Sequence, residues 1–172
     1  MHKSVFLEIS LLFVLFSCAK KETAPVEYSA EEVNRKNMQS VIEKVWNDKD
    51  LTAIDSLFSS TLTREVNGVN LASNKKELAA NLQVYFNGFP DLQINLDEMT
   101  TVGNHVYLHW TLSGTHTGTF AELPPTGKKI KIRGISRADF DDTGKVIREK
   151  VFYNELSLLQ QMGYTLNPPL LE

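Results

Sequence analysis

The chain has 172 residues, 42% of them hydrophobic, and its formal net charge at pH 7 is −3. This length and composition suit one folded domain with a substantial core. The small negative charge gives no general attraction to nucleic acid, and we expect no nucleic-acid partner. The basic segment 128–137 is followed at once by the acidic segment 139–142, which is typical of a solvated strand face.

The first eighteen residues have the pattern of an export signal that ends in a cysteine. Lys3 gives a positive start, and the largely apolar stretch 5–16 is too short to span a bilayer. Cys18 is the only cysteine, so it cannot form an intramolecular disulfide. Leu15-Phe16-Ser17-Cys18 resembles the lipobox of a bacterial lipoprotein, which implies that Cys18 carries a lipid. The alternative is an ordinary secretory signal with an incidental cysteine.

Residues 19–28 are polar and include Pro25, so we interpret them as a tether between the lipid and the domain. The expected organisation is a signal peptide with lipobox at 1–18, the tether at 19–28, one folded domain at 29–164 and a tail at 165–172. The lipoprotein resemblance places the protein in the bacterial cell envelope, bound to a membrane through its N-terminal lipid. No aspartate follows Cys18 directly, which favours the outer membrane over the inner one.

The first half of the domain has helical signals. Ser29 before two glutamates marks a helix start, and Asn74 with Glu77 predicts a capping box at a later helix that ends at Gly88. A short helix is expected at 51–58, and residues 59–71 are expected to be irregular, with a turn at Gly68. The apolar residues at helical spacing are Val33, Met38, Val41, Ile42, Val45 and Trp46 in the first helix, and Leu78, Leu82, Tyr85 and Phe86 in the later one.

The second half has strand signals. Val106, Leu108, Trp110 and Leu112 alternate with polar residues, and the same alternation puts His116 on the Trp110 face. Hairpins are expected at 103–104 and 141–144, and a loop at 124–127. One face of the next strand carries Ile130, Ile132, Gly134, Ser136, Ala138 and Phe140, whose small members leave volume above them. A last strand at 146–154 and a helix at 155–162 complete an α+β domain.

Several short motifs follow one another along the chain in a characteristic order. They are Phe89-Pro90-Asp91-Leu92, Trp110, Gly114-Thr115-His116-Thr117-Gly118, Pro124-Pro125-Thr126-Gly127 and Leu159-Gln160-Gln161-Met162-Gly163. This order resembles the SnoaL-like polyketide (ester) cyclase family, within the group that shares the NTF2-like cone fold. The resemblance covers residues 33–164. It implies N-terminal helices packed on a curved antiparallel sheet, a short C-terminal helix and a pocket inside the cone.

The resemblance also locates a catalytic position. In the family, the acid–base residue is an aspartate at the end of the last strand, and the matching position here is Asn154, which cannot exchange a proton near neutral pH. Lys150 stands where the family often has a tryptophan. The family's histidine at the pocket mouth is missing, and Arg64 is a candidate replacement. The alternative for Arg64 is a surface ion pair with Glu65 or another neighbour.

His116 is the best titratable candidate on the inward face, either as an acid–base group or as a structural histidine bonded to a loop. Lys150 shares strand parity with Phe152 and Asn154, which would point all three inward. His105 and His109 lie about 13 Å apart along a strand, too far to share one ion. We expect no metal and no cofactor.

Three functions remain open. The favoured one is a binding module for a small apolar or aromatic molecule, with a pocket made by Tyr85, Phe86, Trp110, His116, Lys150, Phe152 and Asn154. The second is a cyclase- or isomerase-type enzyme in which His116 is the base and Asn154 polarises a carbonyl. The third is an interaction domain that forms a homodimer through the open face of the sheet, at Tyr107, His109 and Ile135.

Overall fold

The computed structural model describes residues 29–167. The predicted signal peptide, the lipidation of Cys18, the tether and residues 168–172 lie outside this part of the chain, so these expectations stay predictions. Within residues 29–167, no helix is both long and apolar enough to cross a membrane.

The first helix, α1 (Ala30–Ser40), begins where the sequence predicts. The Ser29 hydroxyl accepts the Glu32 backbone N–H, and the Glu32 carboxylate accepts the Ser29 N–H, which completes a capping box. The chain then continues as the π-helical segment η1 (Val41–Asn47), the 3-10 turn η2 (Leu51–Ala53) and the short helix α2 (Ile54–Leu57).

The long helix α3 (Lys75–Gly88) starts at the predicted N-cap. The Asn74 side chain accepts the Glu77 backbone N–H at 3.0 Å. The Glu77 carboxylate accepts the N–H of Ser73 at 2.7 Å, one residue earlier than a capping box requires. The predicted N-cap is therefore confirmed, but the Glu77 carboxylate bonds to Ser73 and not to Asn74.

Six strands form one sheet in the spatial order β2-β1-β6-β5-β4-β3. All neighbouring strands are antiparallel except β1 and β6, which run parallel. The strands are β1 (Phe58–Val66), β2 (Val69–Ala72), β3 (Gln93–Val102), β4 (His105–Thr115), β5 (Lys129–Phe140) and β6 (Val146–Tyr153). The expected irregular segment is wrong, because β1 and β2 occupy most of residues 59–71. The turn at Gly68 between these strands is confirmed.

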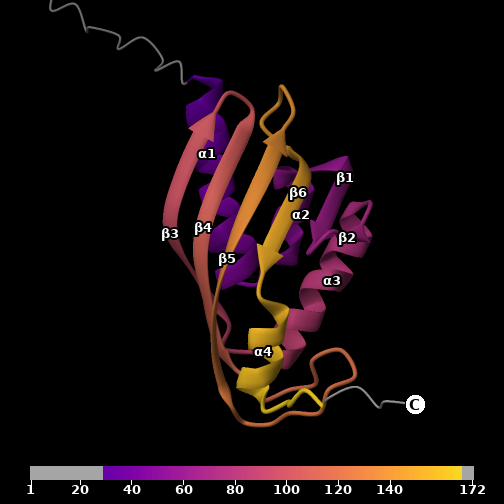
Figure 1. The fold of residues 1–172 in the computed structure, drawn as a ribbon. Coiled ribbons are helices and arrows are strands. Elements are labelled where there is room, and N and C mark those ends of the chain that lie inside the picture. The colour runs from indigo at the N-terminus through magenta and orange to yellow at the C-terminus, as the bar shows by residue number, and fades with distance from the viewer. Residues whose placement is uncertain (1–28, 168–172) are drawn as a thin grey trace, which may run out of the picture.

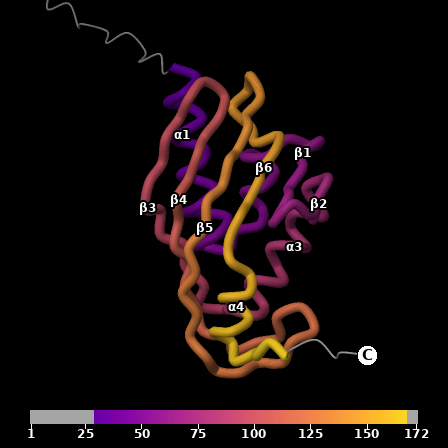
Figure 2. Tube along the Cα trace, in the orientation of Figure 1, coloured from indigo at the N-terminus to yellow at the C-terminus, as the bar shows by residue number. Residues whose placement is uncertain are grey.

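The helices and the sheet form two layers. Figure 1 shows α1, α2 and α3 behind one face of the sheet, while the other face is left open by the described chain. The short helix α4 (Glu155–Met162) follows β6 and ends at Gly163, as predicted. In Figure 2, α1 begins beside the β3–β4 hairpin, whereas α4 and the β4–β5 loop lie at the opposite end. The predicted α+β cone is confirmed.

The core lies between the inner face of the sheet and the helices. On β4, Val106, Leu108, Trp110 and Leu112 are buried, which confirms the predicted alternation. On β5, Ile132, Ser136 and Ala138 are buried on the same side. These residues face the apolar stripe of α1 and η1, which includes Met38, Val41, Val45 and Trp46, and the α3 residues Leu78 and Leu82.

Candidate functional site

An interior cavity of about 30 Å³ lies within the cone. Most of its wall is apolar, but five of its lining residues carry charged or hydroxyl groups: Arg64, Glu149, Ser136 and the pair Tyr85 and Tyr153 described below. The full lining consists of Ile42, Trp46, Arg64, Tyr85, Ile94, Leu108, Trp110, Leu112, Ile132, Ser136, Glu149, Val151 and Tyr153. An apolar cavity with a few convergent polar groups is the usual form of a small-molecule site.

The main polar feature is a buried ion pair between Arg64 of β1 and Glu149 of β6. The side chains are only 4% and 6% exposed, and the two residues are direct partners in the parallel pairing of their strands. The Arg64 guanidinium lies 5.3 Å from the centre of the Trp46 ring, over the ring itself. The Arg64 Nε is buried and has no hydrogen-bond partner. Such a group is rare inside a protein and asks for an explanation.

Arg64 therefore does not form the surface ion pair that we gave as the alternative for this residue. The reason is that residues 58–66 form a strand, so alternate side chains turn inward, and Leu62, Arg64 and Val66 are all buried. Glu149 was not among the predicted site residues. It shares the inward face of β6 with Val151, and the signal available in the sequence was this alternation alone.

A pair of tyrosines forms the second polar feature. The hydroxyl groups of Tyr85 on α3 and Tyr153 at the end of β6 are 3.1 Å apart. Burial raises the pKa of Tyr153, and the neighbouring Tyr85 adds to the shift, so the Tyr153 hydroxyl keeps its proton at neutral pH. Tyr153, like Glu149, was not predicted.

Trp110 lies in the cavity wall, as expected. Its indole Nε1–H donates to the Ser136 hydroxyl at 2.9 Å. The ring covers Gly134, where an added Cβ would lie 2.2 Å from a ring carbon. The volume expected above the small residues of β5 is therefore filled by the Trp110 ring, and the cavity is smaller than the sequence suggests.

Of the two aromatic residues predicted on α3, only Tyr85 lines the cavity. Phe86 is buried and packs against Trp46, with ring centres 6.0 Å apart. Phe86 therefore packs in the core and does not line the cavity.

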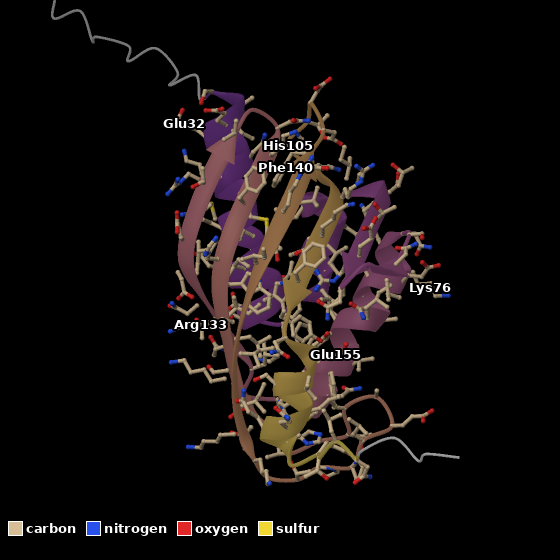
Figure 3. All side chains as sticks on the ribbon, in the orientation of Figure 1. Glu32, Lys76, His105, Arg133, Phe140 and Glu155 are labelled. Carbon is tan, nitrogen blue, oxygen red and sulfur yellow. The ribbon has the colours of Figure 1, made fainter. Side chains whose placement is uncertain are left out.

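The inward orientation predicted for Lys150, Phe152 and Asn154 is wrong. Phe152 is 48% exposed on the outer face, and Lys150 Nζ lies 3.2 Å from the Glu65 carboxylate there. Asn154 is exposed and caps α4, where its side-chain oxygen accepts the Ser157 N–H at 2.9 Å. Glu155, labelled in Figure 3, marks the start of this helix, beyond the end of the strand. From Glu149 to Tyr153, the inward positions of β6 are the odd-numbered ones.

His116 is buried, but the structure does not bring it to the cavity. Its Nδ1 lies 3.1 Å from the Thr126 hydroxyl, and its ring packs on Phe89 with centres 5.2 Å apart. Burial lowers the pKa of His116, so the imidazole is neutral at pH 7. Its Nε2 has no partner. This geometry matches the structural alternative, a histidine that holds the loop between β4 and β5.

The open face of the sheet carries a shallow groove of about 580 Å³. Its wall includes His109, Arg133, Ile135 and Phe152, and Ile135 is 50% exposed. Arg133 is labelled in Figure 3. Dimerisation through this face stays a prediction. Among residues 29–167, no three His, Cys, Asp or Glu side chains are grouped so that they could hold a metal ion.

Comparison with known proteins agrees with this architecture. AclR, a proposed hydroxylase from Streptomyces galilaeus, is 23% identical, with a TM-score of 0.70 over 81% of this chain and 86% of its own. A proposed SnoaL-like polyketide cyclase from Jannaschia sp. CCS1 is 19% identical, with a TM-score of 0.73 over 85% of this chain and 100% of its own. IdmH, a proposed polyketide cyclase from Streptomyces antibioticus, is 18% identical, with a TM-score of 0.66 over 76% and 99%.

At these identities, the solved structures show a shared fold. A search of curated proteins finds no match. A sequence model of the SnoaL-like polyketide cyclases matches residues 36–162, which is most of the chain. The chain therefore belongs to the SnoaL-like polyketide cyclase family.

Proposed function

We propose that this protein binds a small, largely apolar molecule in the interior cavity, with Arg64 as the main polar contact. The observation that carries the proposal is the unpartnered Nε of Arg64, a residue 3% exposed that lines a mostly apolar cavity. Leaving a buried donor unpaired costs about 1–3 kcal/mol, more if it is charged. A ligand oxygen that accepts this N–H would recover that cost.

The hydrogen-bond inventory of the cavity defines the ligand further. Glu149 already accepts from Arg64, and Ser136 already accepts from Trp110. The two tyrosine hydroxyls share one hydrogen bond, so one of their protons is left to donate, and Ser136 retains its own. The Arg64 Nε–H, one tyrosine proton and the Ser136 proton are therefore available to donate to a ligand. Because the charges of Arg64 and Glu149 cancel, the cavity favours a neutral molecule with an acceptor oxygen over a cation or an amine.

Native mass spectrometry of the full-length chain, purified from its own host, tests this proposal. We expect a discrete additional mass in the wild type. Arg64→Lys keeps a positive charge for Glu149 but removes the Nε–H, and we expect it to lose the ligand. Phe152→Ala, on the outer face, is the matched control and should retain it. A wild-type protein without any bound molecule, which also binds none added back from a host extract, would count against the function.

A second candidate function is catalysis with Glu149 as the acid–base residue. The observation that favours it is a carboxylate on the inner face of the last strand, inside the cavity, in a chain that belongs to a cyclase family. Its pairing with Arg64 holds the carboxylate in place inside the cavity. Glu149→Gln should abolish turnover of the retained ligand while the ligand still binds. Unchanged turnover in this variant would exclude Glu149 as the base.

The sequence supports a location for this activity. The lipobox-like segment ending at Cys18 would attach the domain to the envelope through the tether at 19–28. Cys18→Ser should move the protein from the membrane fraction to the soluble fraction of the host. A wild-type protein found only in the soluble fraction would contradict the anchoring.

A further inference from the structure

The interior cavity comes nearest to solvent where β6 ends. Every residue that lines it is buried except Tyr153, which is half-buried. A path from solvent to the cavity therefore runs past the Tyr153 ring. The cavity itself, at about 30 Å³, has room for about one or two water molecules, so any larger molecule needs a wall to move.

Tyr85 lies opposite Tyr153 on this path. Their hydroxyl groups, 3.1 Å apart, link α3 to β6 across the path. Tyr85 is 8% exposed and comes from a helix, whereas Tyr153 belongs to the sheet. Tyr85 is also held from behind, by a loop that packs against it.

That support is the loop between β4 and β5, residues 116–128, which we term the strap. Phe120, on the strap, packs edge-on against Tyr85 with ring centres 5.2 Å apart, and against Phe89 at 5.3 Å. Gly88 makes this approach possible, because a Cβ there would lie 2.7 Å from the Phe120 Cβ. In Figure 2, the strap curves beneath the end of α3. Phe120 thus holds Tyr85 in place beside the path to the cavity.

The strap is held firmly at its base and weakly in its middle. At the base, the His116 N–H donates to the Lys128 carbonyl at 2.9 Å, and the Gly127 N–H donates to the His116 carbonyl at 2.8 Å. Further out, the Gly118 N–H donates to the Gly88 carbonyl at 3.2 Å. Most of the strap is exposed, and its half-buried side chains are Phe120 and Leu123. Segments with few buried contacts are the first to open in a folded protein.

We propose that the strap is a gate: release of Phe120 from α3 lets Tyr85 separate from Tyr153 and opens the cavity to small molecules. The base of the strap stays in place through His116, so the opening is local. That the gate admits a ligand rests on the function proposed above, whereas the opening itself is a property of the fold and can be measured without a ligand.

The two tryptophans of the chain provide the measurement. Trp110 also lines the outer groove, which sets a baseline of quenching in the wild type, but Trp46 and Trp110 both line the cavity and are 6% and 7% exposed. Acrylamide, a small neutral quencher, should reach them through the gate. In the full-length protein, we expect Phe120→Ala to raise the bimolecular quenching constant severalfold. Tyr153→Phe, which removes the hydrogen bond but keeps the ring, should raise it less.

Two further variants make the test decisive. Gly118→Ala keeps Phe120 but places a Cβ 1.9 Å from the Asn87 carbonyl oxygen, which forces the strap away from α3. It should increase quenching as Phe120→Ala does, and it decides the question if Phe120→Ala fails to fold by circular dichroism. Lys150→Ala, on the outer face, should leave quenching unchanged, because Lys150 lines neither the interior cavity nor the outer groove that holds Trp110.

Wild-type quenching in folded Phe120→Ala and Gly118→Ala variants would overturn the gate. An equal increase in Lys150→Ala would also overturn it, because the effect would then be general loosening. A working gate in a protein that retains no ligand would count against the proposed function alone. A retained ligand with quenching unchanged in all variants would count against the gate alone.

Discussion

The ion pair inside the cavity gives a quantitative prediction about stability. Glu149→Ala leaves the Arg64 guanidinium in an apolar wall, where its side chain is 4% exposed and its Nε already lacks a partner. Removing one member of a buried pair costs about 3–5 kcal/mol, because the remaining charge is uncompensated. A domain of this size has a total stability of about 5–15 kcal/mol, so the loss is a large fraction of it. At about 2–4 °C per kcal/mol, the melting temperature should fall by about 6–20 °C.

The assay is urea unfolding followed by tryptophan fluorescence, with the slope of the transition compared between variants. Lys150→Ala is the matched control, because Lys150 follows Glu149 in the sequence and pairs with Glu65 on the outer face, where its side chain is 40% exposed. An exposed pair of this kind contributes at most about 1 kcal/mol. The double variant Arg64→Met/Glu149→Leu removes both charges and should recover most of the loss.

Two results would refute this reasoning. If Glu149→Ala cost no more than Lys150→Ala, water would be reaching the pair and the cavity would not be a low-dielectric site. If the double variant were as unstable as Glu149→Ala alone, the loss would arise from packing and not from an unpaired charge.

Three other predictions concern residues around the site. Gly134→Ala forces the Trp110 ring from its position, since the new Cβ would lie 2.2 Å from it, and should cost about 1–3 kcal/mol and shift the tryptophan emission; an unchanged spectrum would contradict the contact. Burial lowers the pKa of His116 in the folded state, so the contribution of His116 to stability is complete above its unfolded pKa of about 6.5 and is lost as pH falls from there towards the folded pKa. Compared with wild type, His116→Gln should therefore lose less stability over that acidic range, measured by urea unfolding across pH; parallel curves would argue against the buried imidazole. Asn154→Ala removes the cap of α4 and should cost about 1 kcal/mol without loss of the retained ligand; loss of the ligand at unchanged stability would return Asn154 to the site.

The placement of the polar groups explains why the family's usual acidic position is not needed for a polar cavity here. Asn154 stands beyond the end of β6 and serves the helix that follows. Glu149, five residues earlier on the same strand, provides the carboxylate within the cavity, and Arg64 on the neighbouring strand neutralises it. The charged groups of the interior are thus Glu149 on the last strand and its partner Arg64 on β1.

The sequence alone determined the features that depend on near neighbours. The Ser29 and Asn74 caps, the Gly68 turn and the β4 alternation around Trp110 each involve residues within a few positions of one another, so local chemistry decides them. The order of the family motifs also predicted the cone fold, because that order can be recognised in the sequence without coordinates.

The tertiary structure decided which face of β6 turns inward. Both faces of that strand carry charged and aromatic side chains, Glu149 and Tyr153 on one and Arg148, Lys150 and Phe152 on the other, so alternation alone does not choose between them. The choice is made by pairing: Ser136 of β5 faces the core and lies beside Val151, and Arg64 lies beside Glu149 from 85 positions away. Only contacts between elements far apart in the sequence create the buried ion pair and the tyrosine closure, which is why the site became visible in the fold and not in the sequence.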